Sequence, residues 1–234
     1  MATFNNAKNI LVGASPLFLS TKDSTVSGYV ENMEPNASTG VAYVTGESYT
    51  KTLNDAYTAN AVTAKFRNVG YTNNGLQITY NPTYGSVTVD QLLDTAKLFK
   101  ESMEVMIATE MTEGTLENVL AVFGQGGDTL SSALTASTSS TQTLGLAAGA
   151  LGVAPTERQL VAVGQAPTSV SGVVSSERVY YARRVLSVQQ SQFSLARNNP
   201  TTFPVTFRLL PDGNTAYAGQ EYGKIIDRVL SVSA

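Results

Sequence analysis

The stretch Gly75-Leu76-Gln77-Ile78-Thr79-Tyr80 alternates apolar and polar side chains, and this alternation decides the fold class. Successive side chains of a β-strand point to opposite faces, so the apolar members share one face while Gln77 and Thr79 share the other. Turn-forming residues follow at Asn81-Pro82-Thr83, and residues 86–90 then alternate again. We therefore predict a β-hairpin that turns at Asn81-Pro82-Thr83.

Further along the chain, the same period of two recurs in four segments, which are residues 103–110, 179–188, 192–196 and 203–209. In the first of them, Glu104 and Glu110 lie on the polar face. So many alternating segments predict a mainly β protein.

One helix is predicted over residues 116–123, because its apolar residues recur at the spacing of a single helix face. Thr115 is the expected N-cap, since its hydroxyl can accept a hydrogen bond from a free backbone N–H. Gly124 can adopt the left-handed conformation that closes a helix. Such a short helix gains most of its stability by packing on the sheet.

The composition limits both the size and the chemistry of the protein. The chain has 234 residues, of which 42% are apolar and 14% are charged, and its length suits a single domain, residues 1–234. Histidine, cysteine and tryptophan are absent, which excludes thiol nucleophiles, imidazole bases and metal sites that need nitrogen or sulfur ligands. The low charged fraction indicates a surface that is polar but uncharged, or one that is buried against copies of the chain.

The N-terminal segment contains the apolar runs Ile10-Leu11-Val12-Gly13-Ala14 and Leu17-Phe18-Leu19. Pro16 separates them and no small-x-small cleavage site follows, so we expect an N-terminal strand or arm rather than a secretion signal. No stretch approaches the roughly 18 apolar residues of a membrane span, and membrane insertion is not expected.

Charge is distributed unevenly along the chain. Residues 1–100 carry seven bases and seven acids, residues 101–157 carry seven acids and no base, and the remaining residues carry eight bases and four acids. Such polarity favours head-to-tail or side-to-side assembly of identical copies. Two segments are irregular: a polar excursion near residues 27–68, and a Ser/Thr/Ala/Gly-rich insertion near residues 124–156.

Motifs for catalysis and cofactor binding are not found. No glycine-rich loop has the spacing of a nucleotide-binding site, and no loop has the acidic pattern of a calcium site. On one strand Glu104 and Glu110 would lie roughly 20 Å apart, too far for a glycosidase pair. We therefore expect no enzyme activity, no cofactor and no metal.

Several motifs, taken in order, resemble those of the tail tube (major tail) proteins of long-tailed bacteriophages. They are Val69-Gly70-Tyr71-Thr72-Asn73-Asn74-Gly75, residues 76–80 and 84–91, Glu113-Gly114-Thr115-Leu116-Glu117-Asn118-Val119-Leu120, residues 203–212 and residues 223–227. The resemblance covers roughly residues 69–124 and 177–230, and the two irregular segments depart from it.

This resemblance implies a β-sandwich or split barrel with one packed helix, whose sheets join between subunits into a ring-lining barrel. Rings, commonly of six, would stack into a hollow tube for DNA passage during ejection, placing the protein in the virion tail after synthesis in the host cytoplasm. The implied partners are copies of the chain, the tape measure, tail terminator and distal tail proteins, and double-stranded DNA that passes without specific binding.

A lumen-facing surface is our hypothesis for the polar strand faces, on which carboxylates would repel DNA phosphates. Its residues are Gln77, Thr79, Ser86, Thr88, Asp90, Glu104 and Glu110. An alternative is a β-rich surface binding or adhesion module, for which an exposed aromatic platform is the expected signature.

Overall fold

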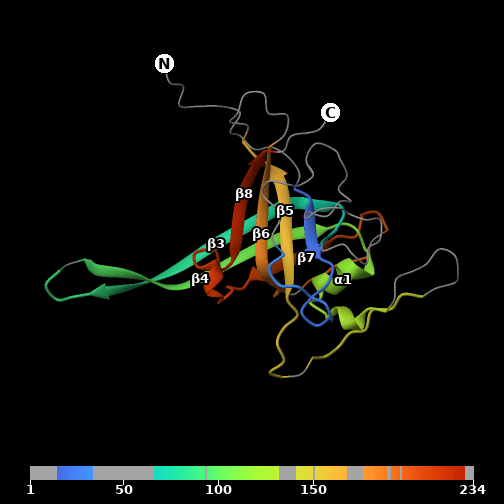
Figure 1. The fold of residues 1–234 in the computed structure, drawn as a ribbon, viewed down its shortest axis with the longest axis horizontal. Coiled ribbons are helices and arrows are strands. Elements are labelled where there is room, and N and C mark those ends of the chain that lie inside the picture. Colours follow the sequence, from blue (N-terminus) through green and yellow to red (C-terminus); the bar gives the residue numbers. More distant parts are fainter. Residues whose placement is uncertain are drawn as a thin grey trace, which may run out of the picture.

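The computed structural model describes residues 15–33, 66–92, 94–131, 141–149, 151–167, 176–188, 191–195 and 197–229. These residues form an eight-stranded antiparallel sheet and one α-helix (Figure 1). The strands are β1 (Leu17–Ser20), β2 (Phe66–Asn68), β3 (Thr72–Thr88), β4 (Thr95–Met111), β5 (Arg158–Gln165), β6 (Ser176–Ser187), β7 (Phe203–Leu209) and β8 (Gly223–Val229). The prediction of a mainly β fold is confirmed.

The hairpin β3–β4 is much longer than predicted. Each strand has 17 residues, and the chain reverses near residues 89–94 instead of at Asn81-Pro82-Thr83. Pro82 lies within β3, opposite Met103. Proline lacks a backbone N–H, which an edge strand tolerates because one of its sides has no partner strand. The predicted turn is therefore wrong, although the predicted alternation continues through it.

The sheet follows the order β2-β1-β5-β6-β7-β4-β3, and β8 pairs with β6. In Figure 1, β5, β6 and β8 run side by side and cross the long β3–β4 hairpin. One core cluster joins buried side chains of β1, β5 and β6 with those of β4 and β7, among them Leu19, Leu160, Ile107 and Phe207. This cluster fixes the direction of the hairpin relative to the other strands.

Most of the other predicted elements are confirmed. The segments near 103–110, 179–188 and 203–209 lie in β4, β6 and β7, and an N-terminal strand forms over Leu17–Ser20. The predicted strand at 192–196 is wrong, because its described residues 192–195 are irregular; there the Phe193 ring stacks on Phe123 and lies tilted against Phe203. The predictions had missed β5, although its Leu160-Val161-Ala162-Val163 run is typical of a strand buried on both faces.

Helix α1 (Leu116–Val122) begins and ends as predicted. Thr115 is its N-cap and accepts a hydrogen bond from the Asn118 N–H, and Gly124 has a φ of 64°. Among the described residues of 124–156 there is a 3₁₀ turn, Gly127–Thr129, and an isolated bridge between Leu130 and Leu144. Much of the predicted 27–68 excursion lies outside the described residues.

Candidate functional site

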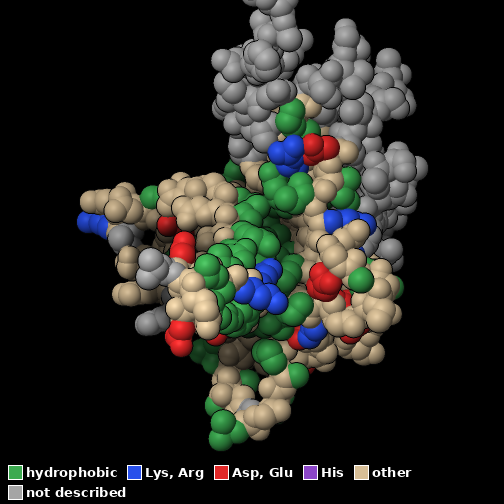
Figure 2. All heavy atoms as spheres, turned by 90° about the vertical axis from the view of Figure 1, so that its left-hand side faces the viewer, with side chains coloured by type: hydrophobic (Ala, Val, Ile, Leu, Met, Phe, Trp, Pro, Cys, Tyr) green, Lys and Arg blue, Asp and Glu red, His purple; other side chains and the backbone are tan. Residues whose placement is uncertain are grey.

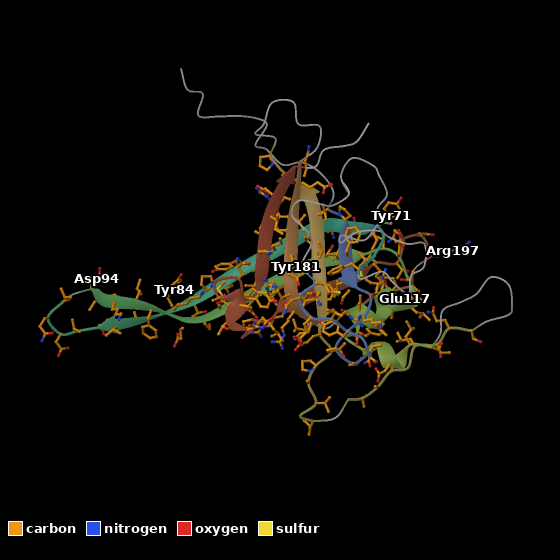
Figure 3. The ribbon with its side chains drawn as sticks, in the orientation of Figure 1. Tyr71, Tyr84, Asp94, Glu117, Tyr181 and Arg197 are labelled. Carbon is orange, nitrogen blue, oxygen red and sulfur yellow. The ribbon has the colours of Figure 1, made fainter. Side chains whose placement is uncertain are left out.

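The distal part of the β3–β4 hairpin projects far from the rest of the molecule (Figures 1 and 3). We call residues 83–92 and 94–101 the arm. Tyr84 and Asp94, which lie on it, are well separated from Tyr181 in the main body (Figure 3). The arm carries six exposed large apolar residues, namely Tyr84, Val87, Val89, Leu92, Leu98 and Phe99. A protruding hairpin with so many exposed apolar side chains is typical of an interaction element.

Cross-strand contacts order the arm internally. Phe99 lies opposite Gly85, and a Cβ atom added to this glycine would approach the Phe99 ring to 2.6 Å. The ring therefore occupies the space that the missing side chain leaves. On the other face of the ribbon, the Lys100 ammonium lies 5.9 Å from the centre of the Tyr80 ring. The arm is thus a defined two-stranded ribbon.

A second apolar surface lies where the arm leaves the body, and we call it the basal patch. Its members are Ile78, Tyr80, Tyr180, Tyr222 and Ile225, of which Tyr80 and Ile225 are each 65% exposed. Tyr180 lies opposite Ile225 in the β6–β8 pair, and the Tyr222 hydroxyl donates to the Met103 carbonyl of β4 at 3.4 Å. Figure 2 shows a diagonal band of hydrophobic side chains on the face from which the arm projects.

The predicted lumen residues fall into three groups. The β3–β4 and β4–β7 registers place Gln77, Thr79, Glu104 and Glu110 on one face of the sheet, away from the core cluster. Ser86 and Thr88 lie on the opposite face of β3, because each is an odd number of residues from Gln77. The register shifts between them insert extra residues into β4 and not into β3, so the alternation along β3 is unbroken. Asp90 lies in the turn. These seven residues therefore do not form one continuous surface within a single chain.

The face that bears Gln77, Thr79, Glu104 and Glu110 also carries a basic side chain, which the sequence analysis did not place there. Strand β7 lies beside β4, and the Arg208 guanidinium is 3.6 Å from the Glu104 carboxylate, with both side chains partly exposed. A hollow of about 170 Å³ on the same face is lined by Gln77, Glu110 and Thr206 among others. The position of Arg208 beside Glu104 follows from the pairing of β7 with β4, and the sequence pattern does not provide this strand order.

Part of the charge asymmetry is likewise satisfied within the chain. Glu157, from the acidic middle of the sequence, accepts two hydrogen bonds of 2.6 Å from Arg184, from the basic C-terminal third. These bonds raise the pKa of Arg184 above its ordinary value. Some of the charges that we expected to join neighbouring copies thus pair internally.

A buried hydrogen-bond network holds the body end of the hairpin against the helix. The Asn118 amide donates to the Val69 carbonyl at 2.8 Å and to the Glu113 carbonyl at 2.9 Å, and its oxygen accepts from Arg67 at 2.6 Å. Burial lowers the pKa of Arg67 to about 10. Because Val69 and Glu113 flank β3 and β4, the network fixes the base from which the arm extends.

A separate hollow of about 340 Å³ lies at the body end of β3. Asn68, Tyr71, Thr72 and Glu113 are among its lining residues, and Tyr71 is 81% exposed. Glu113 does not project freely into it, because its Oε1 accepts the Tyr71 N–H at 3.1 Å. The hollow therefore combines an exposed aromatic ring with an oriented carboxylate.

No protein-family model matches this chain, and a search of curated proteins finds none similar to it. In the described part of the chain, no helix has the length and apolar character needed to cross a membrane. Within the same residues, no group of three or more acidic side chains is placed to hold a metal ion.

Proposed function

We propose that this protein is a structural subunit that assembles with copies of itself into stacked rings, forming a hollow tube of the phage tail tube type. The carrying observation is that a single chain leaves a long apolar arm and an apolar basal patch exposed to water. Large apolar side chains that gather on one exposed, projecting element are a mark of an interaction site. The resemblance of residues 69–124 and 177–230 to tail tube proteins supports the same role.

The sheet edges support assembly as well. Strand β3 is the end strand of the described sheet order, and so is β2 at the other end. Unpaired edges are a liability, and joining them between subunits around a ring removes it. In this proposal the sheets of neighbouring subunits together form a split barrel or sandwich that closes into the tube wall.

The face of β3, β4 and β7 that bears Gln77, Thr79, Glu104 and Glu110 would line the lumen. Its carboxylates repel DNA phosphates, while Arg208 beside Glu104 moderates the local charge. Double-stranded DNA would pass without specific binding. The other partners would be the tape measure, tail terminator and distal tail proteins, and the site of action would be the virion tail.

Negative-stain electron microscopy of the purified protein, with light scattering for its mass in solution, tests the proposal. Hollow rods or rings of uniform diameter are expected. The double variant Glu104→Gln/Glu110→Gln should assemble equally well, since both carboxylates lie on the face assigned to the lumen. Globular monomers at all concentrations, also after addition of the cognate tail initiation proteins, would contradict the proposal.

A second candidate function, a surface-binding module for glycans, is favoured by the hollow beside Tyr71. Sugars stack on exposed aromatic rings and hydrogen-bond to carboxylates and amides, and this hollow offers all three groups. Binding on a glycan array that the Tyr71→Ala variant abolishes would support this reading. Tyr71→Ala should leave a tube intact, because the change removes a side chain outside the arm and leaves the backbone hydrogen-bonding groups of the β3 edge unaltered.

A further inference from the structure

The arm and the basal patch are two neighbouring apolar surfaces on one chain, and its fold prevents the arm from folding back onto the patch. The patch lies at the root of the arm, and the arm extends away from it as a hydrogen-bonded ribbon (Figures 1 and 3). Bringing the arm back onto the patch would require breaking the β3–β4 pairing. Neither surface can therefore be covered by the other within a single chain.

We infer that the arm of one copy packs on the basal patch of the next copy, in a head-to-tail contact. This inference rests on the proposed function, to which it adds the two surfaces that meet. Such a contact uses unlike surfaces, so the copies at the two ends of a row still offer one free arm and one free patch. Repetition then closes a ring if the rotation between copies permits it.

The exposed area fits an interface between two protein chains. The six apolar residues of the arm are between 39% and 65% exposed, which corresponds to roughly 550 Å² of surface. A standard interface buries about 800 Å² per partner, of which about 450 Å² is apolar. These residues lie on both faces of the ribbon, with Tyr84 and Leu98 on one face and Val87 and Phe99 on the other, so an interface that covers the arm must contact both faces.

The character of the side chains favours this pairing over contact between two arms. The basal patch is continuous with the core, because Tyr180 and Tyr222 pack against the main core cluster. An arm that docks there extends an existing core, with aromatic rings on both sides. Two arms in contact would leave both patches uncovered.

Single cysteines test the contact directly, since the chain has no cysteine of its own. One variant carries Leu98→Cys on the arm and another carries Ile225→Cys on the patch. Both positions are 65% exposed, so neither change disturbs packing. After mixing and mild oxidation we expect mainly the mixed disulfide dimer, at least about tenfold above either variant oxidised alone, because docking raises the effective concentration of the two thiols.

Leu195→Cys is the matched control, because Leu195 is 85% exposed and belongs to neither surface. A mixture of Leu98→Cys with Leu195→Cys should give only background cross-linking. Leu98→Cys dimers as the main product would replace the inference with arm-to-arm contact. Mixed dimers no more abundant than this background would overturn it outright.

A second measurement separates this inference from the proposed function. Leu98→Lys and Ile225→Lys should each reduce the mass in solution, and their mixture should stop at dimers, with one intact arm and one intact patch in contact. If both lysine variants form normal tubes, the tube function stands and the arm-to-patch contact fails. If mixed disulfides form and no tubes or rings appear, the contact stands and the tube function fails.

Discussion

At the scale of single residues, Gly70 shows how one missing side chain permits a local structure. Its φ is 85°, and a Cβ atom here would collide with the Glu113 carboxylate, which accepts the Tyr71 N–H. Gly75 has a similar φ of 67° but no atom within 4 Å of its added Cβ. Both glycines therefore need a positive φ, but only at Gly70 would a Cβ atom meet a neighbouring side chain.

We expect Gly70→Ala to reduce the free energy of unfolding by about 1–3 kcal/mol more than Gly75→Ala, because it also displaces the Glu113 carboxylate. Urea denaturation of the two variants and the unchanged protein measures the difference. Equal losses in the two variants would mean that the Glu113 contact contributes nothing.

Asp23 and Arg158 form an ion pair of 2.6 Å with side chains only 1% and 7% exposed. Burial lowers the pKa of Arg158, and the Asp23 carboxylate opposes this shift. Asp23→Ala leaves a buried guanidinium without its carboxylate partner, with the Gln125 carbonyl still accepting from it, and should cost about 3–5 kcal/mol of stability. The more exposed pair Arg178–Asp227 is the control, since Asp227→Ala should cost about 1 kcal/mol or less. Comparable losses in urea denaturation would contradict this ranking.

Asp212 makes stability depend on pH. Hydrogen bonds from the Asn214 N–H and the Asn32 amide lower its pKa below the ordinary value. A carboxyl group whose pKa is lower in the folded state adds stability above its unfolded pKa, and this contribution is lost as the pH falls through the folded pKa. The stability difference between the protein and Asp212→Asn should therefore be constant above about pH 5 and shrink as the pH falls below that value, through the unfolded and then the folded pKa. A difference that stays constant across denaturation curves below this pH would refute the assignment.

At the scale of elements, the local sequence pattern predicted the faces of the β3–β4 hairpin but not the position of its turn. Alternation placed Gln77, Thr79, Glu104 and Glu110 on polar faces, and the register confirms that they share one face. The turn signal at Asn81-Pro82-Thr83 was overridden, because an edge strand accommodates proline and the pairing of β3 with β4 continues past it. Helix α1 was predictable because its cap, its apolar stripe and its closing glycine are all local.

The arm should be separable from the fold. Thr83 and Ser102 are register partners, so an Asn-Gly turn can replace residues 84–101 and close a shorter hairpin. We expect a change of less than about 1 kcal/mol in the free energy of unfolding, because the removed apolar side chains are exposed, together with loss of assembly in light scattering. Ile107→Ala, in the core, should by contrast cost about 2–5 kcal/mol. A large loss of stability in the shortened protein would show that the arm belongs to the core.

At the scale of the whole molecule, the strand order brings together residues that are distant in sequence. Arg208 meets Glu104 because β7 pairs with β4, and Arg184 meets Glu157 through the β5–β6 pair. The same topology places β8 beside the root of the hairpin, where Ile225 joins Tyr80 in the basal patch. The surfaces proposed for assembly therefore arise from tertiary pairing.

The sequence by itself determined the β class, the helix with its cap, the alternation of polar and apolar faces, and the absence of histidine and cysteine chemistry. These properties depend on neighbours within a few residues, where spacing alone fixes which side chains share a face. The tertiary structure decided where the hairpin turns, which base stands beside Glu104, and that the arm and the basal patch are exposed at separate places. Those features depend on the pairing of strands tens of residues apart, which a local pattern does not encode.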